Sequence, residues 1–111
     1  MLKKSHMAAI LESLKSPILF ADTEHVTRYM NRAAIAHYEG GEDLIGRSLL
    51  ECHNEESQAI IKEILHLMIH ENLEEREISE EEGQRIFMRV VRDSNGRVLG
   101  YYERYEPIVD K

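Results

Sequence analysis

The stretch RVVRDSNGRVLGYY, residues 89–102, carries the strongest fold signal in the chain. Apolar runs flank Asn95-Gly96, and an Asn-Gly pair in that position is the strongest short-range indication of a β-hairpin. We therefore expect two antiparallel strands, over residues 84–92 and 97–107, joined by the tight turn Asp93-Ser94-Asn95-Gly96.

Side chains alternate between two faces along the first of these strands. Three apolar residues share the face that we expect to be buried: Ile86, Met88 and Val90. The opposite face carries Phe87, Arg89 and Val91 and is the expected outer face of the sheet. The five tyrosines are expected to pack on the sheet with their hydroxyls reaching water.

The longest predicted helix precedes the hairpin, over residues 54–72. Asn54 is a favourable N-cap, and the two glutamates after it suit the positive end of the helix dipole. Apolar residues at helical spacing predict one buried stripe: Ile60, Ile61, Ile64, Leu65, Met68 and Ile69. His66 and His70 fall on the opposite side, where we expect them to be solvated and, with Glu63, to form at most an incidental surface metal site.

A second amphipathic helix is predicted over residues 3–14, before the helix-breaking Ser16-Pro17. Its apolar residues recur at i, i+3, i+4 and i+7 and form a stripe that a small domain does not fully bury by itself: Met7, Ile10, Leu11 and Leu14. We expect a second copy of the chain to cover this stripe, which predicts a homodimer. The outer face of the sheet is a further candidate for the dimer contact.

Three more strands are predicted, over residues 18–22, 25–30 and 74–79, with Thr23-Glu24 as the turn between the first two. The elements then favour an α+β fold, in which one five-stranded antiparallel sheet has helices packed on a single face.

Two short helical segments are predicted between the second strand and the long helix. Asn31 caps the first, which runs to His37-Tyr38 and ends at Gly40-Gly41. The second is expected to open at Ile45-Gly46.

The composition argues against several classes of function. The chain has 21 acidic and 14 basic residues, a net charge of −7, and its densest charge cluster, residues 72–83, is acidic. Binding to nucleic acid or to an anionic membrane needs clustered Lys and Arg, so we expect neither partner. With one cysteine, no secretory signal and no apolar segment of membrane-spanning length, we expect a cytoplasmic protein.

Three segments resemble the PAS domain family. ILFADTEHVTRYMNRAA, residues 18–34, resembles its opening hairpin and Asn-x-Ala-Ala helix start, and DLIGRSLLECHNEES, residues 43–57, resembles its Ile-Gly-Arg segment. Residues 89–102 resemble its last hairpin, with an Asp-x-x-Gly-x-x-x-Gly pattern. The resemblance covers residues 11–106 and implies a sensory or interaction module with a ligand cavity between the sheet and the inner helices.

The boundaries follow from this resemblance. We place a single domain over residues 1–111, with a flanking helix over 1–15 and the PAS core over 16–108. Cys52-His53 followed by a serine is similar to PAS domains of hemerythrin-associated proteins, which implies a bacterial or archaeal source. Many PAS domains continue into an output helix where this chain has Pro107, so we expect its signal to pass through the surface, through an oligomer or to a separate signalling protein.

The resemblance implies a small-molecule ligand of unknown identity, and the residues expected to face it are Tyr29, His37, Leu50, Cys52, His53, Ile64, Met68, Met88 and Val90. Met68 and Met88 are expected to converge across the cavity, because flexible methionines suit an adaptable site. For His37, a satisfied hydrogen bond in the core and a contact with the ligand stay equally open.

Cys52-His53 has two interpretations. A neighbouring imidazole and the N-terminus of a helix activate a thiol, whereas Glu51, Glu55 and Glu56 oppose a thiolate. We favour a small buried cysteine and a loop histidine bonded to the backbone. No nucleophile, base and orienting group occur together, so we assign no catalytic residue and expect no enzyme.

Two cofactors can be weighed against the family. Photoactive flavin-binding PAS domains resemble GRNCRFLQ, with the cysteine two residues after the arginine, where this chain has Leu49, so flavin is not expected. Haem remains an alternative cofactor, because haem-binding family members place an axial histidine on or near the long helix. In a gas or redox sensor, His53 or His37 would be that ligand. A ligand-free dimerisation subunit is the other alternative.

Overall fold

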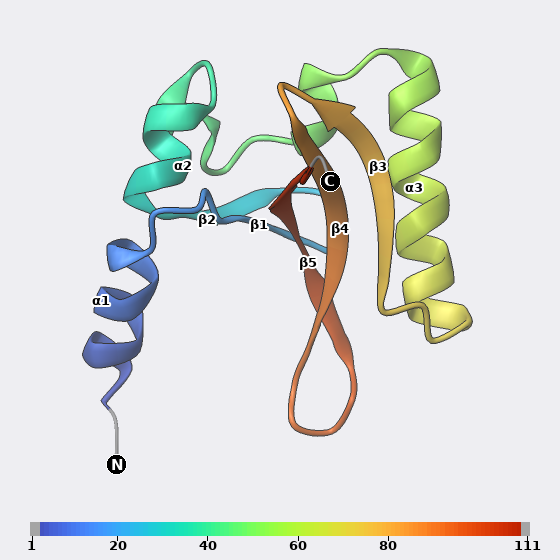
Figure 1. Ribbon diagram of the computed structural model, residues 1–111. Helices are drawn as coiled ribbons and strands as arrows, with labels where there is room; N and C mark the ends of the chain where they lie inside the picture. Colours follow the sequence, from blue (N-terminus) through green and yellow to red (C-terminus); the bar gives the residue numbers. More distant parts are fainter. Residues whose placement is uncertain (1–2, 110–111) are drawn as a thin grey trace.

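One antiparallel sheet of five strands organises the chain, in the order β2-β1-β5-β4-β3 (Figure 1). The computed structural model describes residues 3–109, so residues 1–2 and 110–111 of the predicted domain lie outside it. The strands are β1 (Leu19–Asp22), β2 (Thr27–Met30), β3 (Glu75–Glu81), β4 (Gln84–Arg92) and β5 (Val98–Pro107). The predicted α+β fold is confirmed, and β5 occupies the centre of the sheet.

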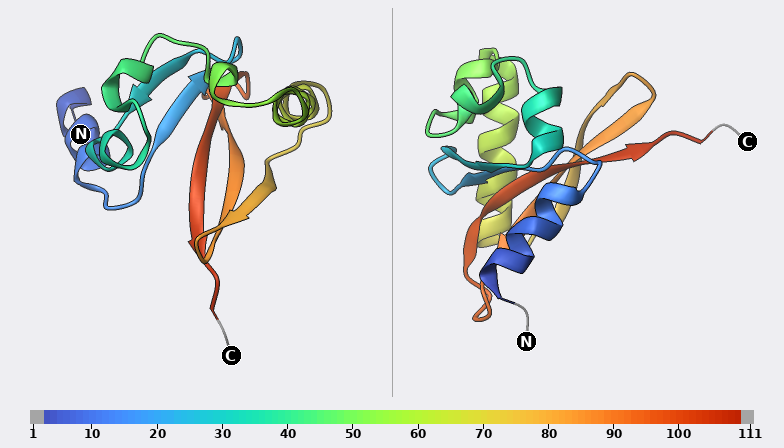
Figure 2. Two further views of the ribbon diagram at one scale, coloured as in Figure 1. Left: turned by 90° about the horizontal axis from the view of Figure 1, so that it is seen from above. Right: turned by 90° about the vertical axis from the view of Figure 1, so that its left-hand side faces the viewer.

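The helices divide between two sides of the molecule. They are α1 (Lys4–Ser13), α2 (Arg32–His37), the 3-10 helices η1 (Gly41–Leu44) and η2 (Leu49–Cys52), and α3 (Glu55–His70). The last four cover the inner face of the sheet, whereas α1 lies on the far side of the molecule from α3 (Figures 1 and 2). Within residues 3–109, no helix is both long enough and apolar enough to span a membrane.

The long helix α3 packs on the sheet through a narrower stripe than predicted. Its buried residues are Ile61, Ile64, Leu65 and Met68. Ile60 and Ile69 are 46% and 43% exposed, so their predicted burial is wrong. At about 100° per residue, the four buried side chains span roughly 100° of the helix surface, and these two isoleucines lie on its flanks. The sheet buries the three residues predicted for β4: Ile86, Met88 and Val90.

The loop around Ile45-Gly46 also differs from the prediction, because it opens no helix. Its backbone pairs with β2 instead: the Gly46 amide donates to the Thr27 carbonyl at 2.7 Å, and the Thr27 amide donates to the Arg47 carbonyl at 2.9 Å. Backbone groups that bond to a strand are unavailable for a helix, so η1 ends before this segment and η2 begins after it.

Asn31 joins four parts of the chain through one buried side chain. Its oxygen accepts from the amides of Ala34 and Ile18, both at 2.9 Å, and so caps α2 as predicted. Its amide group donates to the carbonyls of Leu11 at 3.0 Å and Ser16 at 3.1 Å. All four hydrogen-bonding positions of the asparagine are therefore used, and they hold the end of α1 against the start of α2.

The two halves of the sheet meet where β1 pairs with β5, in the register Phe20 with Tyr102, Ala21 with Tyr101 and Asp22 with Gly100. Gly100 has a φ of 154°, and a Cβ at this position would lie 2.0 Å from the carbonyl oxygen of Ala21. This is far inside van der Waals contact, so the close pairing of β1 with β5 requires glycine.

The variant Gly100→Ala should lower the free energy of unfolding by about 2–4 kcal/mol, because the new methyl group must displace the backbone of β1. Gly96→Ala is the matched control: Gly96 has a φ of 83° but an open space around its Cβ direction, so only the left-handed backbone cost of about 1–2 kcal/mol applies. Urea unfolding followed by circular dichroism measures both. Equal losses in the two variants would contradict the steric account.

Candidate ligand-binding site

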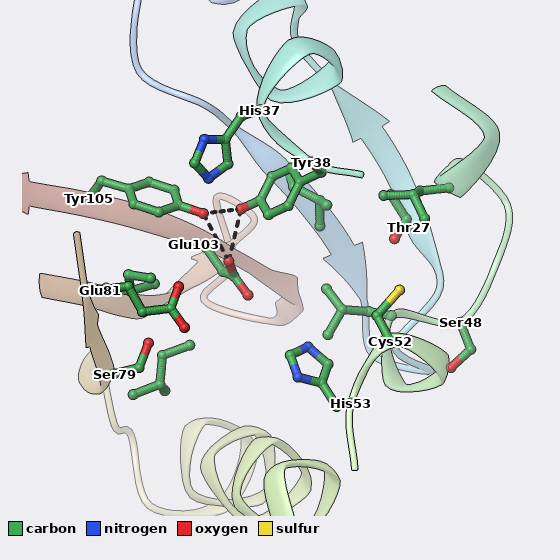
Figure 3. Close-up of a pocket in the computed structure, with 15 residues that line it drawn as sticks. Thr27, His37, Tyr38, Ser48, Cys52, His53, Ser79, Glu81, Glu103 and Tyr105 are labelled. Carbon is green, nitrogen blue, oxygen red and sulfur yellow. Dashed lines mark hydrogen bonds between the residues drawn. The ribbon is translucent and has the colours of Figure 1, made fainter. Parts of the chain in front are cut away.

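A cavity of about 260 Å³ lies between the inner face of the sheet and the helices α2 and η2 (Figure 3). Five apolar residues form part of its wall: Leu19, Leu44, Leu49, Ile78 and Ile86. The remaining lining residues are polar, ionisable or aromatic, and they surround the cavity (Figure 3).

On one side, two tyrosine hydroxyls meet a buried carboxylate. Tyr38 donates to Oε2 of Glu103 at 2.8 Å, and Tyr105 donates to the same oxygen at 3.4 Å. The two hydroxyls also contact each other, and because they carry two protons between them, the three contacts of this group share two O–H donors. The ring of His37 stands edge-on to both tyrosines, with ring centroids 4.9 Å from Tyr38 and 5.2 Å from Tyr105. The result is a polar cluster, the tyrosine–glutamate cluster, formed by His37, Tyr38, Glu103 and Tyr105.

The backbone explains how this cluster forms. Tyr38 is the C-cap of α2, and its amide bonds to the carbonyl of Ala34, so its ring projects from the end of the helix. Glu103 and Tyr105 occupy alternate positions of β5 and share the inner face with Tyr101. Tyr101 is also satisfied inside the protein, where its hydroxyl lies 2.8 Å from Nδ1 of His25.

The environment keeps these tyrosines protonated. Burial, followed by the charge of Glu103, raises the pKa of Tyr38 far above its ordinary value. Burial and the same carboxylate raise the pKa of Tyr105. Burial, again with Glu103 nearby, raises the pKa of Tyr101. The prediction that the tyrosine hydroxyls reach water is therefore wrong for these three residues, because each hydroxyl has a partner within the fold.

On the opposite side, the amide of Gln58 positions Cys52 and His53. Gln58 lies in the first turns of α3 and donates to the carbonyls of Leu50 and His53, both at 2.9 Å. Asn54 caps α3 as predicted, by accepting from the amide of Ser57. This segment is thereby held to the helix, and the ring of His53 points into the cavity towards Glu81 and Glu103 (Figure 3).

The structure places the two residues of the Cys-His pair differently from the favoured interpretation. Cys52 is exposed rather than buried, and it lines the cavity. His53 is half-buried, and its backbone rather than its ring makes the hydrogen bonds with Leu50 and Gln58. Both side chains therefore lie in the cavity wall, as does His37.

The other predicted ligand contacts lie elsewhere. Four of them are buried in the packed core rather than in the cavity wall: Ile64, Met68, Met88 and Val90. Leu50 packs against the same core. Tyr29 is on the outer face, where it donates to Glu12 of α1 at 2.6 Å; burial and this glutamate raise its pKa to about 12. A role for these six residues in binding stays a prediction.

Sequence reasoning missed the tyrosine–glutamate cluster, although one signal was present. Tyr101, Glu103 and Tyr105 are spaced two apart in a predicted strand, so a carboxylate shares one face of the sheet with two large aromatic residues. Charged residues are rarely buried without a partner, and an inward glutamate therefore indicates a polar site. Its partner Tyr38 lies 65 residues away in the chain and has no local signal.

Haem does not fit this cavity. His37 and His53, the two predicted axial ligands, both line it. A volume of about 260 Å³, however, falls below the roughly 300–1,000 Å³ of ordinary small-molecule pockets. A tetrapyrrole is far larger than a ligand of that size.

Comparison with known proteins identifies related sequences and folds. A family model described as a PAS domain matches residues 7–108. Curated proteins yield no match. Among solved structures, a C-terminal domain from Streptococcus mutans superposes with a TM-score of 0.75 at 21% identity, covering 96% of this chain and 85% of that chain.

Two further structures are a PAS domain and a sensory box protein. The PAS domain of Bordetella pertussis BvgS has a TM-score of 0.67 at 16% identity, with 96% of this chain and 87% of that chain covered. A sensory box sensor histidine kinase from Vibrio cholerae has a TM-score of 0.64 at 14% identity, with 95% and 90% covered. At these identities the likeness is one of fold.

The raised tyrosine pKa values predict a loss of stability at alkaline pH. Tyrosine in the unfolded chain ionises near pH 10, whereas the folded protein holds the protons of Tyr38 and Tyr105 to higher pH. The unfolded state then binds fewer protons, so the free energy of unfolding should fall above pH 10, by up to about 1.4 kcal/mol per pH unit for each such tyrosine. Urea unfolding between pH 8 and about 11.5 measures this fall.

Tyr38→Phe and Tyr105→Phe should each make the fall less steep, since the phenylalanine variants have one ionisable hydroxyl fewer in the unfolded state. Tyr102→Phe, on the outer face of the same strand, controls for the loss of a hydroxyl outside the cluster. The same alkaline slope in wild type and in both cluster variants would refute the assignment.

Proposed function

The chain belongs to the PAS domain family, and from this premise we propose that it is a sensory module: a small molecule binds in the cavity and alters contacts with other proteins. The observation that carries the proposal is the cavity itself, which combines an apolar wall with a few convergent polar groups. That combination is characteristic of small-molecule sites, where apolar surface supplies affinity and polar groups fix orientation.

Helix α2 supports a route from the cavity to the surface. Its C-terminal end carries His37 and Tyr38, which line the cavity, and its N-cap Asn31 bonds to the Leu11 carbonyl at the end of α1. A ligand that moves Tyr38 therefore acts on a helix whose other end holds α1. A ligand shifts such an arrangement only by binding one position of α2 better than another, which is the mechanism that we propose.

The apolar surface of the outer face supports a homodimer contact, which we propose responds to ligand binding. Four apolar residues of the α1 segment are exposed: Met7 (48%), Ile10 (50%), Leu11 (38%) and Leu14 (41%). Leu11 and Leu14 border a hollow of about 550 Å³ whose other walls are Ile18, Phe20, Tyr29, Val91 and Tyr102. A continuous apolar surface of this kind marks an interaction site, and we propose that a second copy covers it. A separate signalling protein would then respond to the rearranged dimer.

Closing the mouth of the cavity tests the ligand-binding role. Cys52→Trp places a large ring at the exposed rim without touching the core, and Glu51→Trp adds the same ring to η2 outside the cavity. A fragment library is screened by thermal denaturation against wild type and both variants. A ligand at ten times its Kd adds about 1.4 kcal/mol, which raises Tm by roughly 4–8 °C per kcal/mol in a domain of this size.

We expect the stabilising compounds to lose their effect in Cys52→Trp and to keep it in Glu51→Trp. If no compound stabilises the wild type, the ligand-free dimerisation subunit is the better account. If the shifts survive in Cys52→Trp, the ligands bind elsewhere.

The dimer is tested on α1. Ile10→Glu places a charge in the exposed apolar stripe, whereas Ala9→Glu places it on the opposite side of the same helix, at an exposed position. Light scattering over a concentration series should show a dimer for wild type and Ala9→Glu, and a Kd raised at least about tenfold for Ile10→Glu, since burying an unpaired charge is costly. A wild type that stays monomeric at every concentration would contradict the proposal.

A further inference from the structure

The charges around the cavity all have one sign. Among the described residues that line it, Glu81 and Glu103 are the carboxylates, and neither Lys nor Arg contributes to the wall. An anionic ligand would meet two carboxylates and no cation to pair with. A cationic ligand would instead find partners already in place, since opposite charges attract more strongly where water is excluded.

The two oxygens of Glu103 have different roles. Oε2 accepts from Tyr38 and Tyr105, whereas Oε1 bonds to no side chain or amide within residues 3–109. Glu103 is only 8% exposed, yet Oε1 is not sealed in the protein, because every fully buried side-chain oxygen of the described residues has a partner. Figure 3 shows this second oxygen directed into the cavity, between His53 and Glu81.

The tyrosines hold the carboxylate in this orientation. Both keep their protons, as their raised pKa values require, and so they act as donors to Oε2. A carboxylate held in place by two hydroxyl groups loses little further conformational entropy when a ligand binds to its other oxygen. The site is therefore preorganised for a hydrogen-bond donor.

The size and the remaining walls define the rest of the ligand. At about 30 Å³ per water, a volume of about 260 Å³ holds roughly nine water molecules, and hence an organic molecule of about that many heavy atoms. The rings of Tyr38 and Tyr105 lie beside the acid, and tyrosine rings also attract cations. The five apolar residues of the wall suit a short hydrocarbon or ring.

We infer that the ligand of this cavity is a small organic cation, such as a protonated amine, that donates N–H groups to Glu103 and packs a compact apolar body against the apolar part of the wall. This inference rests on the proposed function and names the chemistry of its ligand. Glu81, which is exposed at the rim, adds to the negative potential that draws the cation in.

Three probes of matched shape separate charge from size: benzylamine, which is protonated at pH 7, benzyl alcohol, which is neutral, and benzoate, which is anionic. Isothermal titration calorimetry at low salt gives the Kd of each with the full chain. We expect benzylamine to bind at least about tenfold more tightly than benzyl alcohol, and benzoate to bind least tightly.

Glu103→Gln removes the charge but keeps the shape, and its amide oxygen can still accept from both tyrosines. This variant should weaken benzylamine at least about tenfold and change the Kd of benzyl alcohol by less than about threefold. Glu106→Gln is the matched control, because Glu106 is exposed on the same strand and lies outside the cavity wall. Glu81→Gln, at an exposed position that does not endanger folding, should weaken benzylamine in the same direction by a smaller factor.

Each outcome has one meaning. Preference for benzylamine that Glu103→Gln abolishes and Glu106→Gln keeps supports the inference. Equal or tighter binding of benzyl alcohol or benzoate overturns the ligand class and leaves the proposed function standing. If none of the three binds at millimolar concentration, the inference fails, and the proposed function is then decided separately by the Cys52→Trp comparison.

Discussion

The close approach of Gly100 to Ala21 is the constraint on which the rest of the structure depends. Three residue pairs between β1 and β5 join the β1–β2 hairpin to the β3–β4–β5 half of the sheet. The cavity takes walls from both halves: α2 follows β2, whereas Glu103 and Tyr105 lie on β5. A side chain at position 100 would separate the halves and take the Tyr38 hydroxyl away from Glu103. The fold and the site therefore share one steric requirement.

Glu103 lowers the stability of the folded protein. Burying a carboxylate without a cation costs free energy, and two tyrosine hydroxyls on one oxygen offset only part of it. Leucine or valine at the same inward position would pack with less cost. A protein that keeps an acid there gains a directed, charged acceptor in the cavity wall, which is what recognition of a small cation requires. Asn31 is the counterexample, because its buried polar groups are all satisfied within the protein and leave none for a ligand.

The elements that depend on local chemistry were predictable from the sequence. Strand β4 has the predicted bounds, because apolar and polar residues alternate along it as far as the turn that contains Asn95-Gly96. Asn31 and Asn54 cap the helices that they were expected to cap. What failed depended on neighbours distant in the chain. The segment at Ile45-Gly46 pairs with β2, which no local pattern reports.

The prediction of the site was also limited by contacts between residues distant in the chain. Cys52, His53 and His37 were identified from residue type and family position, and they lie in the cavity wall. Tyr38 and Tyr105 were assigned to solvent, because the carboxylate that binds both hydroxyls is recognised only when β5 is placed beside α2. Of that cluster, only the inward position of Glu103 could be read from the chain, through its alternation with Tyr101 and Tyr105.

The central claim is that the cavity beside Glu103 is a binding site for a small organic cation. Intermolecular nuclear Overhauser effects between the ring protons of benzylamine and the methyl groups of the protein test it most directly, because they report where the molecule lies. We predict contacts with Leu44, Ile78 and Ile86, whose side chains line the cavity. Contacts with Leu14 and Val91 of the outer hollow instead, or none at saturating benzylamine, would contradict the account.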